Sequence, residues 1–206
     1  MTPGPDRILR ILSSGTLVKV GSIASGNTFG ATFWTDGKME APMLPETPWL
    51  LLHPLSDELF WIDGCQDVAD ENGWESQEKY SEVPFAQAPS LKEYRSVLRG
   101  SGGLSPDKER YLRTRCWWAL NDRVRNRKRP IPLGAVSRAN LLKLRSMLNE
   151  NEASDRLMAA EVSRHLRDFD EANRLLTFQF PDDHARAANL IRRLTEQRDF
   201  TVRRVN

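Results

Sequence analysis

The chain is poor in the residues that build metal and redox sites. Its 206 residues include only two cysteines, Cys65 and Cys116, and three histidines, His53, His165 and His184. The two cysteines lie far apart in the sequence, which favours two reduced, mostly buried thiols, with a long-range disulfide as the alternative. The motifs H-E-x-x-H and G-x-S-x-G are missing, as is a phosphate-binding glycine loop. The sequence therefore predicts a protein that is not an enzyme and holds no cofactor or metal.

Long apolar runs and a large excess of one charge are missing too. The longest apolar run, Trp49–Leu52, is far too short to span a membrane, and the N-terminus lacks a signal-peptide pattern. A net charge of +2 is too small to indicate a nucleic-acid or membrane partner by itself. With 39% apolar residues, the chain can pack a core. We therefore expect a soluble, folded, cytoplasmic protein without a membrane partner.

Residues 8–64 have the pattern of short strands. The segments Ala31–Gly37 and Glu58–Gly64 share the frame F-W-x-D-G, 27 residues apart. Alternating apolar positions followed by Asp-Gly predict a strand that ends in a tight turn, because glycine accepts positive φ. Thr16–Ile23 alternates in the same way. The prolines of Ala41–Trp49 predict an extended connection, since proline disfavours helix at the residue before it.

Two polar turns stand before apolar strands, at Ile11–Val20 and at His53–Ile62. In spacing and turn placement, roughly sixty N-terminal residues resemble a zinc ribbon, in which two such turn-and-hairpin units hold one metal ion. The resemblance implies a small antiparallel β-ribbon domain. His53 and Ser56 stand where a C-x-x-C pair would be, and Cys65 is the only other soft ligand in the region. We therefore expect a degenerate ribbon without zinc.

A ribbon without its metal needs another source of stability. We expect four aromatic side chains to supply it, those of Phe33, Trp34, Phe60 and Trp61. Truncating Trp61 to alanine would then cost about 3 to 5 kcal/mol, provided that this side chain is buried.

After residue 65 the pattern changes. Residues 66–104 are predicted to be an acidic linker, because 66–82 contains six acids and one lysine. A short amphipathic helix capped by Ser90 lies within the linker. The run Arg99–Gly103 then breaks the chain.

From Ser105 onward the apolar residues recur at helical spacing. Ser105 followed by Pro106 predicts a helix start, and that long helix must stop before Pro130. Four more helices are expected to start near Ser137, Ser154, Asp170 and Pro181. The short gaps between them predict antiparallel hairpins.

One of these hairpins, Leu157–Leu176, resembles a tetratricopeptide repeat. Ala160 and Ala172 match the small residues at which the two helices of such a hairpin cross, and Asp168-Phe169 match its turn. Arg167 replaces the glycine of that turn. The triplet R-D-F returns 31 residues later, at Arg198, close to the period of about 34 in such arrays. An ordinary helical bundle is the alternative.

The sequence as a whole predicts an α+β protein. We expect a small antiparallel β-ribbon domain at 1–65, the acidic linker at 66–104, and a helical-hairpin domain at 105–206. This order looks like that of an uncharacterised bacterial family with a zinc-ribbon-like region followed by a tetratricopeptide-like region. The resemblance implies an architecture, and it implies no activity.

The leading functional hypothesis is a non-enzymatic interaction or adaptor protein that binds another protein through its helical domain. The last helix should turn Ala185, Ala188, Ile191 and Leu194 inward. Its outer face would then offer an acidic partner three arginines, Arg186, Arg192 and Arg193. A solvated capping face is the alternative reading of the same residues.

Nucleic-acid binding is the alternative function. The stretch Arg110–Arg129 contains eight basic residues, one acid and two tryptophans, and basic residues interleaved with aromatics can bind phosphates and stack on bases. The candidate contacts are Arg113, Arg123, Arg125, Arg127 and Arg129. The acidic segment 66–82 could instead be an internal partner of this helix. A hydrolase would need a pocket assembled from residues distant in the sequence.

Overall fold

The chain has an α+β architecture, with small antiparallel sheets in its N-terminal part and helices in its C-terminal part. The computed structural model describes residues 1–70, 78–100 and 103–205. The chain forms two compact units. The β unit comprises Met1–Ala31 and Glu40–Glu93, and the helical unit comprises Thr32–Met39 and Tyr94–Asn206.

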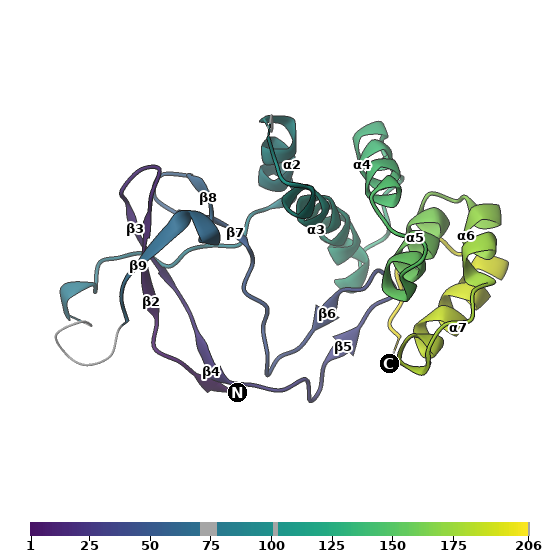
Figure 1. Cartoon of the computed structure of the whole chain (residues 1–206), viewed down its shortest axis with the longest axis horizontal. Helices are drawn as coiled ribbons and strands as arrows, with labels where there is room; N and C mark the ends of the chain where they lie inside the picture. Colours follow the sequence, from purple (N-terminus) through teal and green to yellow (C-terminus); the bar gives the residue numbers. More distant parts are fainter. Residues whose placement is uncertain (71–77, 101–102, 206) are drawn as a thin grey trace. The chain divides into compact units, whose positions relative to one another are not determined.

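The strands are short (Figure 1). They are β1 (Thr2–Pro3), β2 (Arg7–Ile11), β3 (Leu17–Val20), β4 (Ile23–Ser25), β5 (Thr32–Phe33), β6 (Met39–Glu40), β7 (Leu50–Leu52), β8 (Leu59–Trp61) and β9 (Cys65–Asp70), with a 3-10 turn, η1 (Ile62–Gly64), before β9. Strands β3, β2 and β9 form one sheet in that order, and β7 pairs with β8. Both sheets are antiparallel, as the hairpin pattern predicts.

The segment 84–87 joins these two sheets. The Lys19 N–H donates to the Pro84 carbonyl and the Ala86 N–H donates back to Lys19, both at 2.8 Å. One residue later, Leu52 and Gln87 exchange two hydrogen bonds of 2.9 Å. The joined sheets enclose one apolar core, made of Leu9, Ile11, Val18, Val20, Leu51 and Phe60.

The two polar turns expected from the sequence are held by the same pair of hydrogen bonds. In each, the N–H of the first residue donates to the carbonyl five positions later, and the N–H of the fifth residue donates back to the first. These distances are 2.9 and 2.7 Å in 11–16, and 2.8 and 3.0 Å in 53–58. Gly15 and Asp57 both have positive φ, at 75° and 55°. The Ser13 hydroxyl donates to the Glu58 carboxylate at 2.7 Å and links the turns.

The helices follow the predicted order. They are α2 (Leu91–Gly100), α3 (Pro106–Arg125), α4 (Ala135–Ser146), α5 (Ala153–His165), α6 (Phe169–Leu176) and α7 (Asp182–Glu196). Ser105 caps α3, since its hydroxyl accepts from the Lys108 N–H at 3.3 Å. Helix α5 begins one residue before Ser154, which is therefore not its cap. None of the helices that the structure describes is long and apolar enough to cross a membrane.

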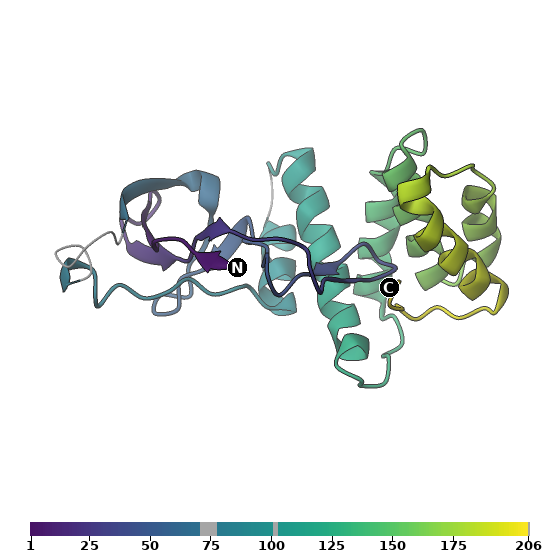
Figure 2. The same cartoon turned by 90° about the horizontal axis from the view of Figure 1, so that it is seen from below.

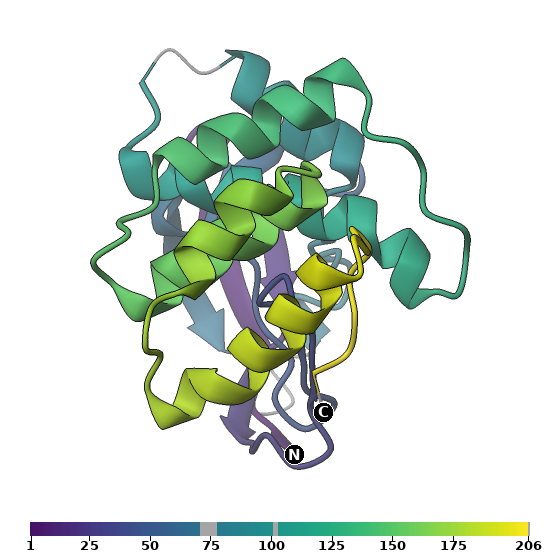
Figure 3. The same cartoon turned by 90° about the vertical axis from the view of Figure 1, so that its right-hand side faces the viewer.

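Helices α5, α6 and α7 pack as consecutive hairpins (Figures 2 and 3). Ala160 and Ala172, the small residues expected at the crossing of α5 and α6, are both completely buried. Ala188 and Ile191 of α7 pack into the same apolar cluster. The inward stripe predicted for the last helix is confirmed for Ala188, Ile191 and Leu194, which are buried, while Ala185 is half-buried. Small side chains allow the helices to approach closely.

The repeated R-D-F triplet forms two matching helix ends. Arg167 and Arg198 follow α5 and α7 with positive φ of 64° and 54°, and the next residue of each triplet donates its N–H to the helix carbonyl five positions earlier, at 2.9 Å. The triplets also contact each other. The Arg167 guanidinium lies 4.1 Å from the ring centroid of Phe200, and that of Arg198 lies 4.8 Å from the ring of Phe169.

The F-W-x-D-G frame is not a structural repeat. In the first copy, β5 leads into a turn of the helical unit in which Asp36 is buried. In the second copy, β8 leads into η1 of the β unit and Asp63 is exposed. The environments differ because Asp36 has a buried arginine partner, Arg125.

The four aromatics of these two frames consequently have different roles. Only Phe60 belongs to the core of the β unit, with 4% of its surface exposed. Trp61 is half-buried and Phe33 is 43% exposed. Because Trp61 is not fully buried, replacing it with alanine should cost less than the about 3 to 5 kcal/mol expected for a fully buried aromatic.

The unit boundaries differ from the expected division at 65 and 105. Residues 66–70 continue the sheet as β9, because their backbone pairs with β2. Residues 32–39 belong to the helical unit, where the side chains of Thr35 and Asp36 are buried. The central part of the acidic stretch 66–82, residues 71–77, lies outside the described residues. The suggested contact of this stretch with the basic helix therefore stays a prediction.

Candidate functional site

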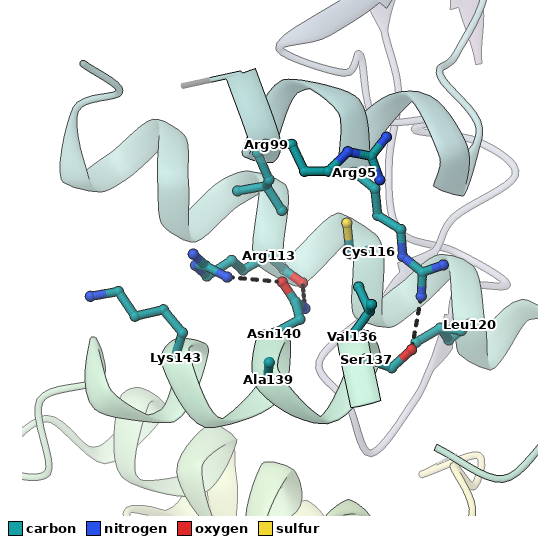
Figure 4. A pocket seen from close by; sticks show the side chains of 11 residues that line it. Arg95, Arg99, Arg113, Cys116, Leu120, Val136, Ser137, Ala139, Asn140 and Lys143 are labelled. Carbon is teal, nitrogen blue, oxygen red and sulfur yellow. Dashed lines mark hydrogen bonds between the residues drawn. The ribbon is translucent and has the colours of Figure 1, made fainter. Parts of the chain in front are cut away.

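Helices α2, α3 and α4 line an open hollow of about 490 Å³, and all of its lining residues belong to the helical unit (Figure 4). We call it the α2–α4 groove. Its lining consists of Arg95, Leu98, Arg99, Arg113, Cys116, Leu120, Val136, Ser137, Ala139, Asn140 and Lys143. The volume lies within the usual range of ligand pockets, roughly 300 to 1,000 Å³.

Helical spacing brings these side chains together. Leu98 and Arg99 follow Arg95 by about one turn on α2, Cys116 and Leu120 follow Arg113 on α3, and Ala139 and Lys143 follow Val136 on α4. Residues three and four apart share a helix face, so each helix contributes one stripe. The stripes of α3 and α4 each combine apolar residues with one cation, and that of α2 combines Leu98 with two arginines.

Helix α4 has a second apolar face besides its buried one. Leu141 and Leu144 are completely buried in the core of the helical unit. Val136 is 63% exposed, and Ala139 beside it is exposed too. The groove therefore presents apolar surface that the fold itself does not cover.

The lining carries four cations and no carboxylate. Arg113 donates to Glu109 at 2.6 Å and to Asn140 at 3.3 Å, so its charge is compensated within α3. Arg95 donates to the neutral hydroxyl of Ser137 at 2.8 Å. Among the described residues, Arg95, Arg99 and Lys143 have no carboxylate partner. The groove thus has a cationic rim around an apolar floor.

Cys116 lies at the floor of the groove, with the cationic side chains around it (Figure 4). Burial raises the pKa of its thiol to about 11, although the nearby guanidinium groups of Arg95 and Arg113 act to lower it. The thiol is therefore neutral at pH 7 and behaves as a small apolar side chain. Both cysteines are free, as expected.

A buried ionic cluster lies elsewhere in the helical unit. Asp36 pairs with Arg125, whose side chain is only 3% exposed. Asp36 also accepts a 2.8 Å hydrogen bond from Asn121. Burial raises the pKa of the Asp36 carboxyl, against the opposite effect of Arg125. On α5, the completely buried Glu161 and Arg164 form a second pair at 2.5 Å.

Arg164 of the second pair also connects α5 to residues 199–201 and to Thr35. Arg164 donates to the carbonyls of Asp199 and Thr201, the latter at 2.9 Å. It also reaches the Thr35 hydroxyl at 3.4 Å. These charged groups are paired with residues of the same unit and are buried from solvent. The cluster therefore stabilises the fold of the helical unit.

The three histidines have different local environments. His53 is buried in the β unit, while His165 is buried in the helical unit, where the Trp117 indole N–H donates to its Nδ1 at 3.4 Å. His184 contacts the neighbouring Asp183 at 2.6 Å on the surface.

Acidification should destabilise the protein through His165. Burial, with Arg164 nearby, lowers the pKa of this imidazole from 6.5 to about 4. Between these pH values the unfolded chain binds a proton that the folded chain does not, so stability falls as the pH falls from about 6.5 to about 4. The full contribution is about 3 kcal/mol.

Urea unfolding at pH 7 and pH 4.5 measures this loss, with His165→Asn as the control. Asparagine keeps an acceptor for the Trp117 N–H and cannot be protonated in this range. We expect the variant to lose less stability between the two pH values than the original protein. An equal loss in both would show that His165 is not the responsible group.

The five arginines proposed to bind nucleic acid do not share one surface. Arg125 is buried against Asp36, and Arg113 lines the groove and is paired with Glu109. Arg123, Arg127 and Arg129 are exposed at the end of α3 and in the segment after it. Arg127 itself ends the helix with a positive φ of 57°.

The three arginines proposed to bind a protein on α7 also differ from one another. Arg186 and Arg193 are exposed. Arg192 is half-buried and donates to the Leu176 carbonyl at 2.8 Å, which caps the end of α6. Reversing the charge of Arg192 would therefore disturb the packing of α6 and α7, so Arg186 and Arg193 are the better probes of this face.

His53 and Ser56, which stand where a zinc ribbon has two cysteines, are joined by hydrogen bonds. The Ser56 backbone N–H and hydroxyl both contact the His53 Nδ1, at 3.3 and 3.0 Å. The equivalent positions of the other turn are Ile11 and Ser14. Within 1–70, 78–100 and 103–205, no three residues among the histidines, cysteines and acids come close enough together to hold a metal ion.

The sequence does not reveal the groove, because the lining comes from three separate helices. One signal was present on α4, where Val136, Ala139 and Lys143 form a stripe separate from that of Leu141 and Leu144. Packing in a helical hairpin uses one apolar stripe of a helix, so a second stripe indicates a further contact surface. Which residues of α2 and α3 lie opposite that stripe is decided by tertiary packing.

The chain matches no protein-family model, no curated protein and no solved structure. The resemblances to a zinc ribbon and to a tetratricopeptide hairpin therefore stay predictions, and the function is argued from the groove alone.

Proposed function

We propose that this protein is a non-catalytic adaptor that binds another protein in the α2–α4 groove. The observation that carries the proposal is the combination of uncovered apolar surface on α4 with a cationic rim. Apolar surface at the centre of an interface supplies most of the binding free energy, and charges at its rim select and steer the partner.

The chemistry of the groove favours binding over catalysis. The Cys116 thiol is neutral because burial raises its pKa. The lining contains no histidine or carboxylate to act as a base for this thiol or for the Ser137 hydroxyl. Its polar groups Ser137 and Asn140 already bond to arginines. Binding, by contrast, needs only complementary shape and charge.

Replacing Val136 with glutamate should abolish partner capture. Val136 is 63% exposed, so the substitution places a charge on the apolar floor with little effect on folding. The experiment is chemical cross-linking in cells that naturally produce the protein, followed by affinity purification. We expect the original protein to capture a defined partner and Val136→Glu to lose at least nine-tenths of it.

The control is Arg186→Glu with Arg193→Glu, which alters the outer face of α7 and leaves the groove unchanged. This double variant should capture the same partner as the original protein. Loss of the partner in the control, with retention in Val136→Glu, would move the interface to α7. Equal capture by all three proteins would contradict a specific interface on either face.

A further inference from the structure

The shape of the groove is that of a helix-binding site. Stripes from α2 and α4 line it, and Cys116 and Leu120 of α3 contribute to the same lining (Figure 4). Val136 and Ala139 are exposed in this groove, so its apolar residues can accept a further helix. A helix fits because its anchors recur every three or four residues, as the lining residues do.

The charge around the groove selects an acidic occupant. Three of its four cations have no carboxylate partner among the described residues, and two of them, Arg99 and Lys143, are exposed. An occupant with carboxylates beside its apolar stripe would pair with these groups, whereas a basic one would be repelled. The apolar floor disfavours a nucleic-acid backbone, which has no comparable apolar face.

The cations lie on both sides of Cys116. In Figure 4, Arg113 and Lys143 lie on one side, and Arg95 lies on the other side, with Ser137 and Leu120. Arg113 is already compensated by Glu109, so Lys143 carries the uncompensated charge on that side. On that side, a carboxylate of the occupant should therefore meet Lys143.

From this arrangement we infer that the occupant is an acidic amphipathic helix of the partner protein, seated with its apolar stripe on Val136, Ala139 and Leu120 and its carboxylates at Arg99 and Lys143. The inference rests on the proposed function and specifies the partner's chemistry.

Three fluorescein-labelled peptides of equal length test it by fluorescence anisotropy. The first has leucines at helical spacing and glutamates elsewhere, the second replaces each glutamate with lysine, and the third scrambles the first so that the leucine stripe is lost. We expect the first peptide to bind at least tenfold more tightly than the other two. A labelled single-stranded oligonucleotide is the fourth probe and should bind more weakly than the first peptide.

Charge reversal locates the site. The double variant Arg99→Glu with Lys143→Glu should bind the acidic peptide at least tenfold more weakly and the lysine peptide more tightly than the original protein. Arg186→Glu with Arg193→Glu makes the same change in net charge on exposed residues outside the groove. It should leave both affinities within about twofold, because the interaction of exposed charges is screened beyond about 8 Å.

Other outcomes overturn the inference. Equal binding of the ordered and scrambled peptides would mean that charge alone attracts the probe. Tighter binding of the oligonucleotide, lost on reversal of Arg99 and Lys143, would assign the groove to nucleic acid. If no peptide binds while Val136→Glu still loses its cellular partner, the proposed function stands and the acidic helix is wrong. Self-association blocked by Val136→Glu would make the occupant a second copy of the chain.

Discussion

Replacing Arg164 with methionine is expected to lower the free energy of unfolding by about 3 to 5 kcal/mol, because removal of one member of a buried ion pair leaves its partner charged and unpaired. Arg164 and Glu161 are both completely inaccessible to solvent. Methionine fills much of the arginine volume, so the loss reports charge and hydrogen bonding more than packing. Chemical unfolding at pH 7, followed by circular dichroism, measures it.

Arg164 makes more than one bond, which is why the effect should be large. Its guanidinium donates twice to Glu161, at 2.8 and 2.5 Å, and donates to the carbonyls of Asp199 and Thr201. Without it, two buried carbonyls lose a donor and a buried carboxylate loses its counter-charge. The C-terminal segment would also lose these two hydrogen bonds to α5.

The double variant Glu161→Met with Arg164→Met is the matched control. Removing both charges eliminates the unpaired carboxylate, so the double variant should be more stable than Arg164→Met alone. A double variant with a lower free energy of unfolding than Arg164→Met would contradict this prediction. It would mean that Glu161 is not left as an unpaired charge in the single variant.

Replacing Asp36 with alanine is expected to lower the free energy of unfolding by about 3 kcal/mol, for the same physical reason in a different place. Arg125 would keep Asp122, at 2.8 Å, and the Trp118 carbonyl, at 2.9 Å, so the loss should fall at the lower end of the range. Asn121 would lose the acceptor of its side-chain amide. Thermal and chemical unfolding at pH 7 measure the change.

Two controls separate the charge from the shape. Asp36→Asn keeps an acceptor for Asn121 and removes the charge. Its free energy of unfolding should therefore lie between those of the original protein and Asp36→Ala. Asp122→Ala removes the second carboxylate from Arg125, but its side chain is 39% exposed, and the cost should stay below about 1 kcal/mol. An Asp122→Ala cost equal to that of Asp36→Ala would mean that burial of Asp36 is unimportant.

The sequence predicted the local structure well where a residue type decides the backbone by itself. Ser105 and Pro106 start α3 because a hydroxyl satisfies a free helix N–H and proline suits the first turn. The inward stripe of α7 follows from the spacing of Ala188, Ile191 and Leu194. The α+β class follows from the change of period between the two halves of the chain.

The sequence was less informative where one motif can take two environments. Phe33-Trp34 and Phe60-Trp61 have the same pattern, yet Phe60 is in a core and Phe33 is 43% exposed. Asp36 shows the reason, since its burial depends on Arg125, a partner 89 positions away. Burial of a charge becomes favourable only when its counter-charge is positioned by the rest of the fold.

By itself, then, the sequence determined most of the helices and the two polar turns, because caps, periodicity and turn residues act over a few positions. It did not predict β9, whose residues form a strand by pairing with β2. The tertiary structure alone decided which charges are available. Among the basic residues of Arg110–Arg129, it places Arg125 in a buried ion pair and Arg113 on the wall of a groove. It also combined stripes from α2, α3 and α4 into one candidate site, since contacts between side chains far apart in sequence exist only after the helices have packed.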